Sequence, residues 1–289
     1  MLTVNQYCRK VFGEKMYKLS LNGGFTCPNR DGTLDTRGCI FCSAGGSGDF
    51  APCAALPIEL QIDEAKAKVA SKYHGSRYIA YFQAFTNTYA PVDKLRLLYL
   101  PVITRDDIAV LSIATRPDCL GDDVLALLAE LNRIKPVWVE LGLQTTKPES
   151  IRYIRRGYET VVYDEAVRKL NAIGIHVITH VILGLPNETE ADMLDTVRHV
   201  VSSGSGGIKL QLLHVLEGTD LAADYSAGMF RTMELNEYIA LLKDCLALLP
   251  EDMVVHRLTG DGPKKSLIAP LWTGDKKRVI NAINRQLNI

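Results

Sequence analysis

Three cysteines near the N-terminus have the spacing of a metal site. Cys39 and Cys42 form a C-x2-C pair, and eleven residues separate Cys27 from Cys39. A C-x2-C pair suits either a tetrahedral zinc ion or an iron–sulfur cluster. A structural zinc needs a fourth ligand, for which Cys53 and Cys8 are the nearest candidates. A [4Fe–4S] cluster held by three thiolates leaves one iron open for chemistry, and three cysteines are then the expected number.

Repeated strand and helix units must position these thiols. Apolar runs rich in Val, Ile and Leu alternate with segments of helical period, which is typical of βα units around a parallel sheet. The strands are expected at residues 18–21, 78–82, 110–114, 137–143, 176–183, 208–213 and 254–258. The helices are expected at residues 62–72, 92–99, 122–134, 163–173, 188–202, 235–248 and 276–287. Short connections favour a full or partial (β/α) TIM-like barrel over a doubly wound open sheet.

Local signals place the helix ends and the cysteine loop. Asn187, with Glu190 three residues on, is the expected N-cap of one helix, and Gly174 is expected to end another. The loop with Cys27 begins directly after the first strand. A barrel therefore places this loop at its C-terminal mouth, where active sites are built.

Composition indicates one globular domain of 289 residues, with a core barrel at about 15–215 and a C-terminal extension at about 216–289. The chain has no run of 18 apolar residues and no recognisable signal peptide, so we expect a cytoplasmic protein without a membrane partner. Seven cysteines in a reducing compartment argue against a disulfide framework. Lys and Arg total 33, as do Asp and Glu, so a nucleic-acid partner must be held by local patches.

Six segments resemble those of a known family. In chain order they are YKLSLNGGFTCPNRDG, LSIATRPDCL, WVELGLQTTKPESIRYIRRGY, HVILGLPNET, LHVLEGTDLA and RLTGDGPKKSLIAPLW. They resemble the radical S-adenosylmethionine (radical SAM) enzymes, and among them the YtqA/YhcC-type proteins related to the catalytic subunit of Elongator. The family's usual motif is C-x3-C-x2-C, whereas this chain has C-x11-C-x2-C. Long spacing of this kind marks the subgroup, and the resemblance covers nearly the whole chain.

The resemblance implies two cofactors, a [4Fe–4S] cluster held by Cys27, Cys39 and Cys42, and S-adenosylmethionine (SAM). In such enzymes the open iron binds the amino nitrogen and carboxylate of SAM. An electron from the cluster cleaves the S–C5′ bond, and the 5′-deoxyadenosyl radical abstracts hydrogen from the substrate. The cofactors carry this chemistry, while the protein supplies position and a dry site.

The resemblance also suggests residues that hold SAM. The carboxylate of SAM calls for a guanidinium, and Arg156 stands where Elongator-like sequences have such an arginine. Arg155 and Arg152 are its neighbours, and a solvated cation at a helix end is the ordinary alternative for each. Gln144, at the end of the fourth strand, is expected to bind the ribose of SAM. An ordinary polar strand end is its alternative.

Two departures from the family pattern require substitutes. The segment YFQAFTNTYA replaces the usual Gly-Gly-Glu-like turn that receives the amino group of SAM, and it offers Gln83 and Asn87. Ala114 stands where Elongator-like sequences have a glutamate before Thr-Arg-Pro-Asp. The role of that missing glutamate falls to one of three candidates, which are Ser112, Thr115 and Glu140.

Substrate contacts are expected at the ends of the last strands. His180 and His214 face the cavity if they point inward, whereas a hydrogen-bonded core histidine is the ordinary alternative. The loop LTGDGPKK, with Asp261 and Lys264, could bring backbone amides and cations to an anion, or be an ordinary turn. A local phosphate footprint could combine this loop with other cations, namely Arg30, Arg37, Lys265 and residues 276–278.

The subgroup is associated with tRNA wobble-uridine modification, so the resemblance implies tRNA as the substrate. The implied reaction converts the 5-carboxymethylaminomethyl group to 5-aminomethyl, with a flavodoxin or ferredoxin as electron donor. Such an enzyme must take the base out of the anticodon stack. Two alternatives stay open at this point: a radical SAM enzyme acting on a small metabolite, and a zinc-stabilised protein that binds without catalysis.

Overall fold

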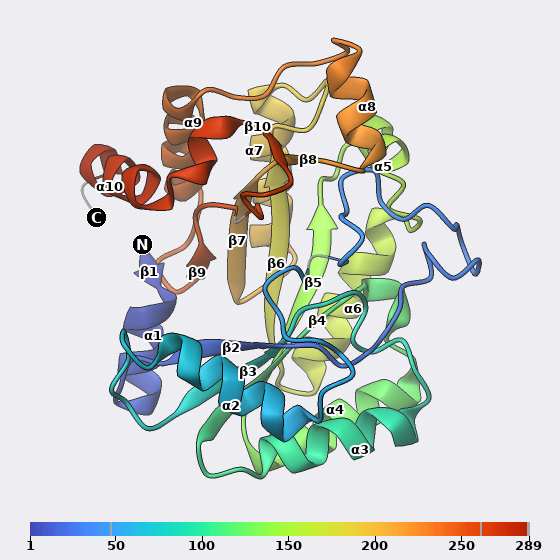
Figure 1. The fold of residues 1–289 in the computed structure, drawn as a ribbon, viewed down its shortest axis with the longest axis vertical. Coiled ribbons are helices and arrows are strands. Elements are labelled where there is room, and N and C mark those ends of the chain that lie inside the picture. The colour runs from blue at the N-terminus through green and yellow to red at the C-terminus, as the bar shows by residue number, and fades with distance from the viewer. Residues whose placement is uncertain (47, 261, 288–289) are drawn as a thin grey trace.

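A parallel sheet of eight strands forms the centre of the computed structural model, which describes residues 1–46, 48–260 and 262–287 (Figure 1). The strand order is β1-β9-β7-β6-β5-β4-β3-β2. From β2 to β7 each strand lies beside its predecessor in the chain, without the reversal of order that defines a doubly wound sheet. The sheet curls into a partial TIM-like barrel, which confirms the predicted fold class.

The strands of the barrel are short and separated by helices. They are β1 (Leu2–Thr3), β2 (Tyr17–Leu21), β3 (Tyr78–Phe82), β4 (Ile108–Thr115), β5 (Val137–Gln144), β6 (His176–Leu183), β7 (Gly207–Leu212) and β9 (Val254–Arg257). Strands β8 (Val215–Leu216) and β10 (Leu267–Ala269) form a separate antiparallel pair.

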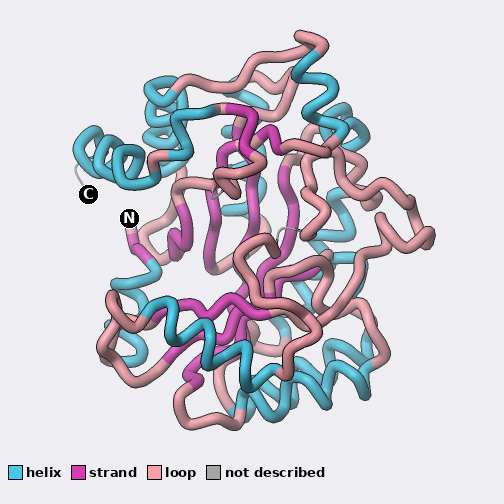
Figure 2. Tube along the Cα trace, viewed as in Figure 1, coloured by secondary structure: helices cyan, strands magenta, loops and turns pink. Residues whose placement is uncertain are grey.

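The helices lie around the outside of the strands (Figure 2). They are α1 (Val4–Phe12), α2 (Ile58–Val69), α3 (Val92–Ile103), α4 (Asp122–Ile134), α5 (Pro148–Tyr153), α6 (Thr160–Ala172), α7 (Glu190–Ser202), α8 (Asp220–Ser226), α9 (Leu235–Ala247) and α10 (Lys276–Leu287). Two 3-10 turns, Pro117–Cys119 and Leu271–Gly274, complete the regular structure described.

All seven predicted strands are confirmed within two residues at their ends, and α4 and α10 match their predicted bounds. Helices α2, α3 and α6 differ by three or four residues at one or both ends, and the sequence reading missed α1, α5 and α8. The predicted N-cap at Asn187 is wrong. Thr189 caps α7 through a capping box with Asp192, while Asn187 occupies a left-handed turn with φ 63°. Gly174, with φ 72°, ends α6 as predicted.

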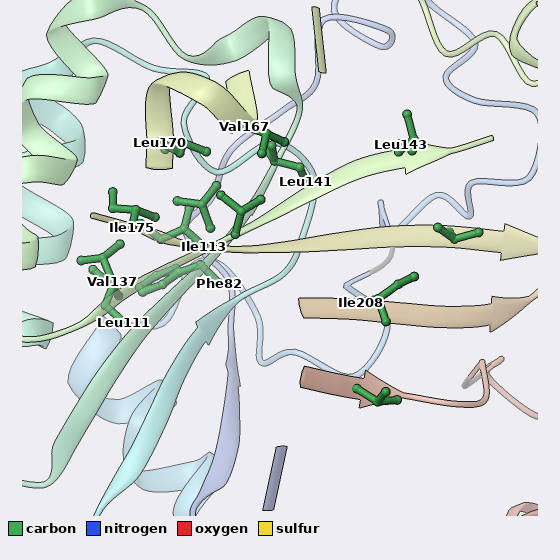
Figure 3. Close-up of a cluster of buried hydrophobic side chains, with 14 of the residues drawn as sticks. Phe82, Leu111, Ile113, Val137, Leu141, Leu143, Val167, Leu170, Ile175 and Ile208 are labelled. Carbon is green, nitrogen blue, oxygen red and sulfur yellow. The ribbon is translucent and has the colours of Figure 1, made fainter. Parts of the chain in front are cut away.

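Side chains along each strand point alternately toward the helices and toward the barrel interior. On β5, Val137, Leu141 and Leu143 point outward and belong to the same buried apolar cluster as Val167 and Leu170 of α6, with Leu141 beside Val167 (Figure 3). Successive side chains of a strand point to opposite faces, so the even-numbered residues of β5 line the interior. The apolar core therefore lies between sheet and helices, and the barrel interior is left for polar groups.

Helix α1 packs into one end of the barrel. Its buried Cys8 and its partly buried Tyr7 belong to an apolar cluster with Trp138 of β5 and Ile178 of β6. Tyr7 also stacks on His176 at the start of β6, with ring centroids 5.5 Å apart. Because these strand residues lie at or near the N-terminal ends, α1 closes the end opposite to the mouth.

None of the described helices is long and apolar enough to cross a membrane.

Candidate active site

The three cysteines line one cavity of about 290 Å³ at the C-terminal mouth of the barrel. Cys27, Cys39 and Cys42 share it with residues from β3 to β7 and with the loop after β9. The loop from Leu21 to Cys27 brings the first thiol over the strand ends. The sequence prediction that the cysteine loop lies at this mouth is confirmed.

Side chains within the cysteine loop hold its shape. The amide Nδ2 of Asn29 donates to the carbonyl of Arg155 at 2.7 Å and lies 3.4 Å from Cys39 Sγ. The guanidinium of Arg30 donates to the carbonyls of Cys42 and Ser43 at 2.9 and 2.7 Å. These contacts fix two of the three cysteines before any metal binds.

The chemistry of the thiols fits an iron–sulfur cluster. Burial, together with the neighbouring Cys42 thiol, raises the pKa of Cys39 to about 12. A metal ligand must be a thiolate, and bound cations offset this cost of ionisation. Within the described residues no three His, Cys, Asp or Glu side chains converge on one point as the ligands of a single metal ion do. The three thiolates of a cluster bind different irons and need not converge.

The predicted SAM-binding residues divide into two groups. Gln83, Thr115 and Gln144 line the cavity at the ends of β3, β4 and β5. Asn87 does not line it, because its buried amide joins two strands by donating to the carbonyls of Phe82 and Ala114. These two bonds, together with a Tyr99 hydroxyl that donates to the Asn87 carbonyl, give Asn87 a structural position behind the site.

Two non-glycine residues at the mouth adopt a left-handed backbone. Gln144 has φ 62° and Phe85 has φ 59°, and both line the cavity. Such conformations cost energy for residues with a Cβ atom and concentrate at functional sites. At Gln144 the bend ends β5 and leaves the side-chain amide at the cavity wall.

Arg156 lines the cavity, but its guanidinium already has four partners. It donates to the carbonyls of Tyr158, Leu143 and Thr145 at 2.8–2.9 Å and to the Thr160 hydroxyl at 3.2 Å. These acceptors occupy most of its five N–H groups. In this arrangement Arg156 ties the end of β5 to the turn before α6. Its predicted role as the partner of the SAM carboxylate stays a prediction.

Arg116 is a second cation beside the cysteines. It forms a two-point ion pair with Asp118, at 2.9 and 2.6 Å, and lies over the ring of Tyr158. The structure shows the pair formed, with Arg116 at the cavity wall.

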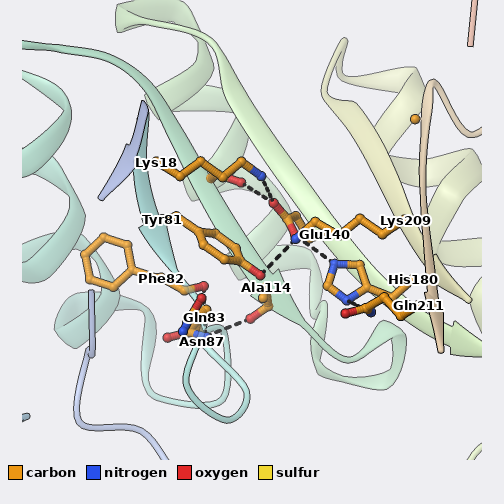
Figure 4. A network of polar contacts seen from close by, with 12 residues as sticks. Lys18, Tyr81, Phe82, Gln83, Asn87, Ala114, Glu140, His180, Lys209 and Gln211 are labelled. Carbon is orange, nitrogen blue, oxygen red and sulfur yellow. Dashed lines mark hydrogen bonds and ion pairs between the residues drawn. The ribbon is translucent and has the colours of Figure 1, made fainter. Parts of the chain in front are cut away.

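A polar layer forms the floor of the cavity (Figure 4). The carboxylate of Glu140 contacts the ammonium of Lys18 at 2.5 Å, Ser112 Oγ at 2.8 Å and His180 Nε2 at 2.7 Å, and it also contacts the ammonium of Lys209. Ser112 thus supports Glu140 from β4 and does not line the cavity itself. One carboxylate on β5 receives groups from four other strands.

The charges of this floor depend on one another. Burial disfavours the Glu140 anion, but Lys18 and Lys209 outweigh it and hold the pKa of Glu140 well below its usual range. Burial beside the ammonium of Lys209 lowers the pKa of His180 to about 4. His180 is therefore neutral near pH 7 and Glu140 is ionised.

The predicted substrate residues lie in different places. His180 and His214 line the cavity, as does Pro263 of the loop after β9. Lys264 is exposed on that loop and does not line the cavity. Asp261 lies outside the described residues.

With this geometry in view, comparisons with known proteins identify the family. The sequence profile of the radical SAM superfamily matches residues 34–200, and that of the radical SAM C-terminal domain matches residues 206–288. The first match alone covers more than half of the chain. The chain belongs to the radical SAM superfamily.

Two curated relatives resemble the chain over most of its length. It is 46% identical to the uncharacterized protein YtqA of Bacillus subtilis, over 99% of this chain and 88% of that protein. It is 36% identical to the protein YhcC of Escherichia coli, over 96% of this chain and 89% of that protein. These similarities confirm the resemblance to YtqA/YhcC-type proteins.

More distant similarities include a protein whose name mentions tRNA. The chain is 24% identical to a tRNA uridine(34) acetyltransferase of Methanocaldococcus jannaschii, over 55% of this chain and 29% of that protein. The structure of the archaeal Methanocaldococcus infernus Elp3 superimposes with a TM-score of 0.68 at 15% identity, over 94% of this chain and 63% of that one. This chain thus spans less than two thirds of each of these two proteins. The likeness to the Elp3 structure shows a shared fold.

As a radical SAM protein, the chain uses a [4Fe–4S] cluster and SAM. The thiols at the mouth fit such a cluster, and the assignment of the polar strand ends beside them to SAM stays a prediction. The sequence reading missed Lys18, Lys209 and Arg257, which line or border the same cavity. The signal was present in β7, where Lys209 and Gln211 alternate with apolar residues in a buried strand.

Proposed function

We propose that this radical SAM enzyme modifies the wobble uridine of tRNA, converting a 5-carboxymethylaminomethyl group to 5-aminomethyl. The observation that carries the proposal is the cavity itself. It has the cysteines at its mouth and, at its floor, the buried Glu140 and Lys209, with Lys18 as a second cation on Glu140. The substrate's side chain is polar and ends in a carboxylate, so it matches a cationic floor better than an apolar one. The choice of a tRNA uridine as substrate rests on the name of a distant relative, a tRNA uridine(34) acetyltransferase.

The residues of the chain then have separate tasks. Cys27, Cys39 and Cys42 hold the cluster, and Asn29 keeps the loop and the Cys39 sulfur in place. Gln83, Thr115 and Gln144 offer amides and a hydroxyl to SAM at the strand ends. When bound, these cofactors would supply a radical that abstracts one hydrogen from the methylene beside the nitrogen, with the electron that starts the reaction coming from a flavodoxin or ferredoxin. Return of one electron to the cluster and addition of water to that carbon would break its bond to the nitrogen, so that the two-carbon unit leaves as glyoxylate and 5-aminomethyl stays on the base. The protein would act in the cytoplasm, where tRNA and such donors occur.

Aromatic side chains at the mouth suit a base that has left its stack. Phe41, Phe50 and Phe85 line the cavity beside the cysteines, and Phe50 is 53% exposed. A flipped base is held by stacking on such rings and by contacts with its Watson–Crick edge. Arg30, whose guanidinium lies 5.7 Å from the centre of the Phe85 ring, adds a cation at the same rim.

The proposal is tested with reconstituted holoenzyme, SAM, a reductant and tRNA that carries 5-carboxymethylaminomethyluridine. Nucleoside mass spectrometry after digestion should show 5-aminomethyluridine and release of 5′-deoxyadenosine. Release of 5′-deoxyadenosine without any change in the tRNA would reject tRNA as the substrate and favour a small metabolite. Protein that binds one zinc and no iron would reject the radical mechanism itself.

A further inference from the structure

The cavity is strongly cationic although the chain as a whole has no net charge. Among the described residues that line it, five carry a positive side chain and two a carboxylate. The cations are Arg30, Arg116, Arg156, Lys209 and Arg257, and the carboxylates are Asp49 and Glu140. Lys18 reaches Glu140 as a further cation. This excess attracts an anionic ligand.

Most of these cations bind groups of the protein itself, so the floor is the part of the cavity to consider for a ligand. Arg30 and Arg156 donate to backbone carbonyls, and Arg116 is paired with Asp118. At the floor, two lysines share the single carboxylate of Glu140. The Lys209 side chain is 4% exposed and that of Glu140 is fully buried, whereas that of Lys18 is 23% exposed, so little water reaches Lys209 and Glu140.

The donors of Lys209 indicate room for one more acceptor. Its ammonium has three N–H groups. In the described structure its hydrogen bonds go to Glu140 and to the Tyr81 hydroxyl, the latter at 3.2 Å. Lys18 and Lys209 both lie 4.6 Å from the centre of the Tyr81 ring. The two ammonium groups thus contact the same ring and the same carboxylate.

We propose that Lys209, with the charge of Lys18 beside the same Glu140 carboxylate, binds a carboxylate at the inner end of the substrate side chain, so that the cavity selects uridines whose 5-substituent ends in a carboxylate. This inference rests on the proposed function. A substrate carboxylate would balance the floor, with two ammonium groups facing two carboxylates. Buried charges are tolerated when they are paired in this way.

The order of the groups along the substrate side chain suits such anchoring. The carboxylate is the outermost group of the 5-carboxymethylaminomethyl substituent, so it enters deepest when the base occupies the mouth. The methylene and amine groups next to it then lie between the floor and the cysteine loop. The floor therefore positions the carbon atoms beside the nitrogen, in addition to selecting the substrate.

A binding experiment tests the carboxylate site without relying on turnover. Reconstituted holoenzyme is titrated calorimetrically with the nucleoside 5-carboxymethylaminomethyluridine and with its carboxamide, which differ only in the terminal group. The wild type should bind the acid at least about tenfold more tightly than the amide, which corresponds to about 1.4 kcal/mol. Equal affinities, or no binding of either nucleoside, would overturn the inference.

Two variants and a control assign the preference to the floor. Lys209→Met is combined with Glu140→Gln, so that no unpaired carboxylate stays buried, and Lys18→Met is made alone in case the double variant does not fold. Both should reduce the preference for the acid to within about twofold, whereas the exposed Lys243→Met should keep it. A preference that survives both floor variants contradicts the assignment. Preferential binding of the acid without conversion of tRNA would support the carboxylate site while rejecting the proposed function.

Discussion

The carboxylate of Glu140 lies 2.5 Å from the ammonium of Lys18, although the two residues are 122 positions apart and belong to β5 and β2. Strands β3 and β4 separate these strands in the sheet. The contact therefore crosses the barrel interior and can form only because the sheet curls. The same interaction links two distant strands of the curled sheet and builds the floor of the cavity.

Replacing Glu140 by Ala should destabilise the protein by about 3–5 kcal/mol, because the change leaves the buried Lys209 without its carboxylate. Urea unfolding at neutral pH measures this difference. The matched control is Glu130→Ala, which breaks an exposed pair with Arg96 and should leave stability almost unchanged. Equal effects of the two substitutions would contradict the energetic role of the floor.

Stability should fall as the pH is lowered from about 6.5 to about 4, partly because of His176. Burial lowers the pKa of this histidine from 6.5 to about 4 in the folded protein. Between these values the unfolded chain binds a proton that the folded protein excludes, so acid favours unfolding by up to about 1.4 kcal/mol per pH unit for each such proton.

The substitution His176→Phe isolates this contribution. The ring stacks on Tyr7 and packs against Trp138, and its buried Nε2 has no hydrogen-bond partner among the described residues, so a phenyl ring should fit the site. Urea unfolding at pH 7, 6 and 5 should show a pH slope smaller by up to about one proton. An unchanged slope would mean that other groups account for the acid sensitivity.

Each of the variants Cys27→Ala, Cys39→Ala and Cys42→Ala should lose the cluster, since all three thiols face the cavity. Iron and sulfide content after anaerobic reconstitution measures the loss. Two controls should retain full iron: the exposed Cys53→Ala and Cys245→Ala in the core of α9. Loss of iron from Cys53→Ala would show that a fourth cysteine takes part and that the three-ligand argument is wrong.

The substitution Arg156→Lys should lower the free energy of unfolding by about 2–3 kcal/mol, because a lysine cannot reach all four acceptors of this buried guanidinium. Arg152→Lys, at an exposed position on α5, is the matched control and should have little effect. Unfolding experiments are combined with a SAM-binding titration of the holoenzyme. Unchanged stability with much weaker SAM binding would instead support the role predicted from sequence.

The sequence predicted what local patterns encode. Runs of Val, Ile and Leu located all seven predicted strands, and chain order placed the cysteine loop at the mouth because that loop follows β2 directly. Local patterns could not show that Glu140 meets Lys18 and Lys209, which are 122 and 69 positions away. Local patterns also could not show that the side chains of Asn87 and Arg156 donate hydrogen bonds to backbone carbonyls. Short elements such as α8 and β10 carry too few residues to display a period.

The central claim is tested most directly by the nucleoside profile of tRNA from a strain that lacks the gene. Mass spectrometry should show 5-carboxymethylaminomethyluridine accumulating at the wobble position and 5-aminomethyluridine, with products made from it, disappearing. Expression of the wild-type protein should restore the profile, whereas expression of Cys39→Ala should not. A wobble-uridine profile that is the same with and without the gene would contradict the account.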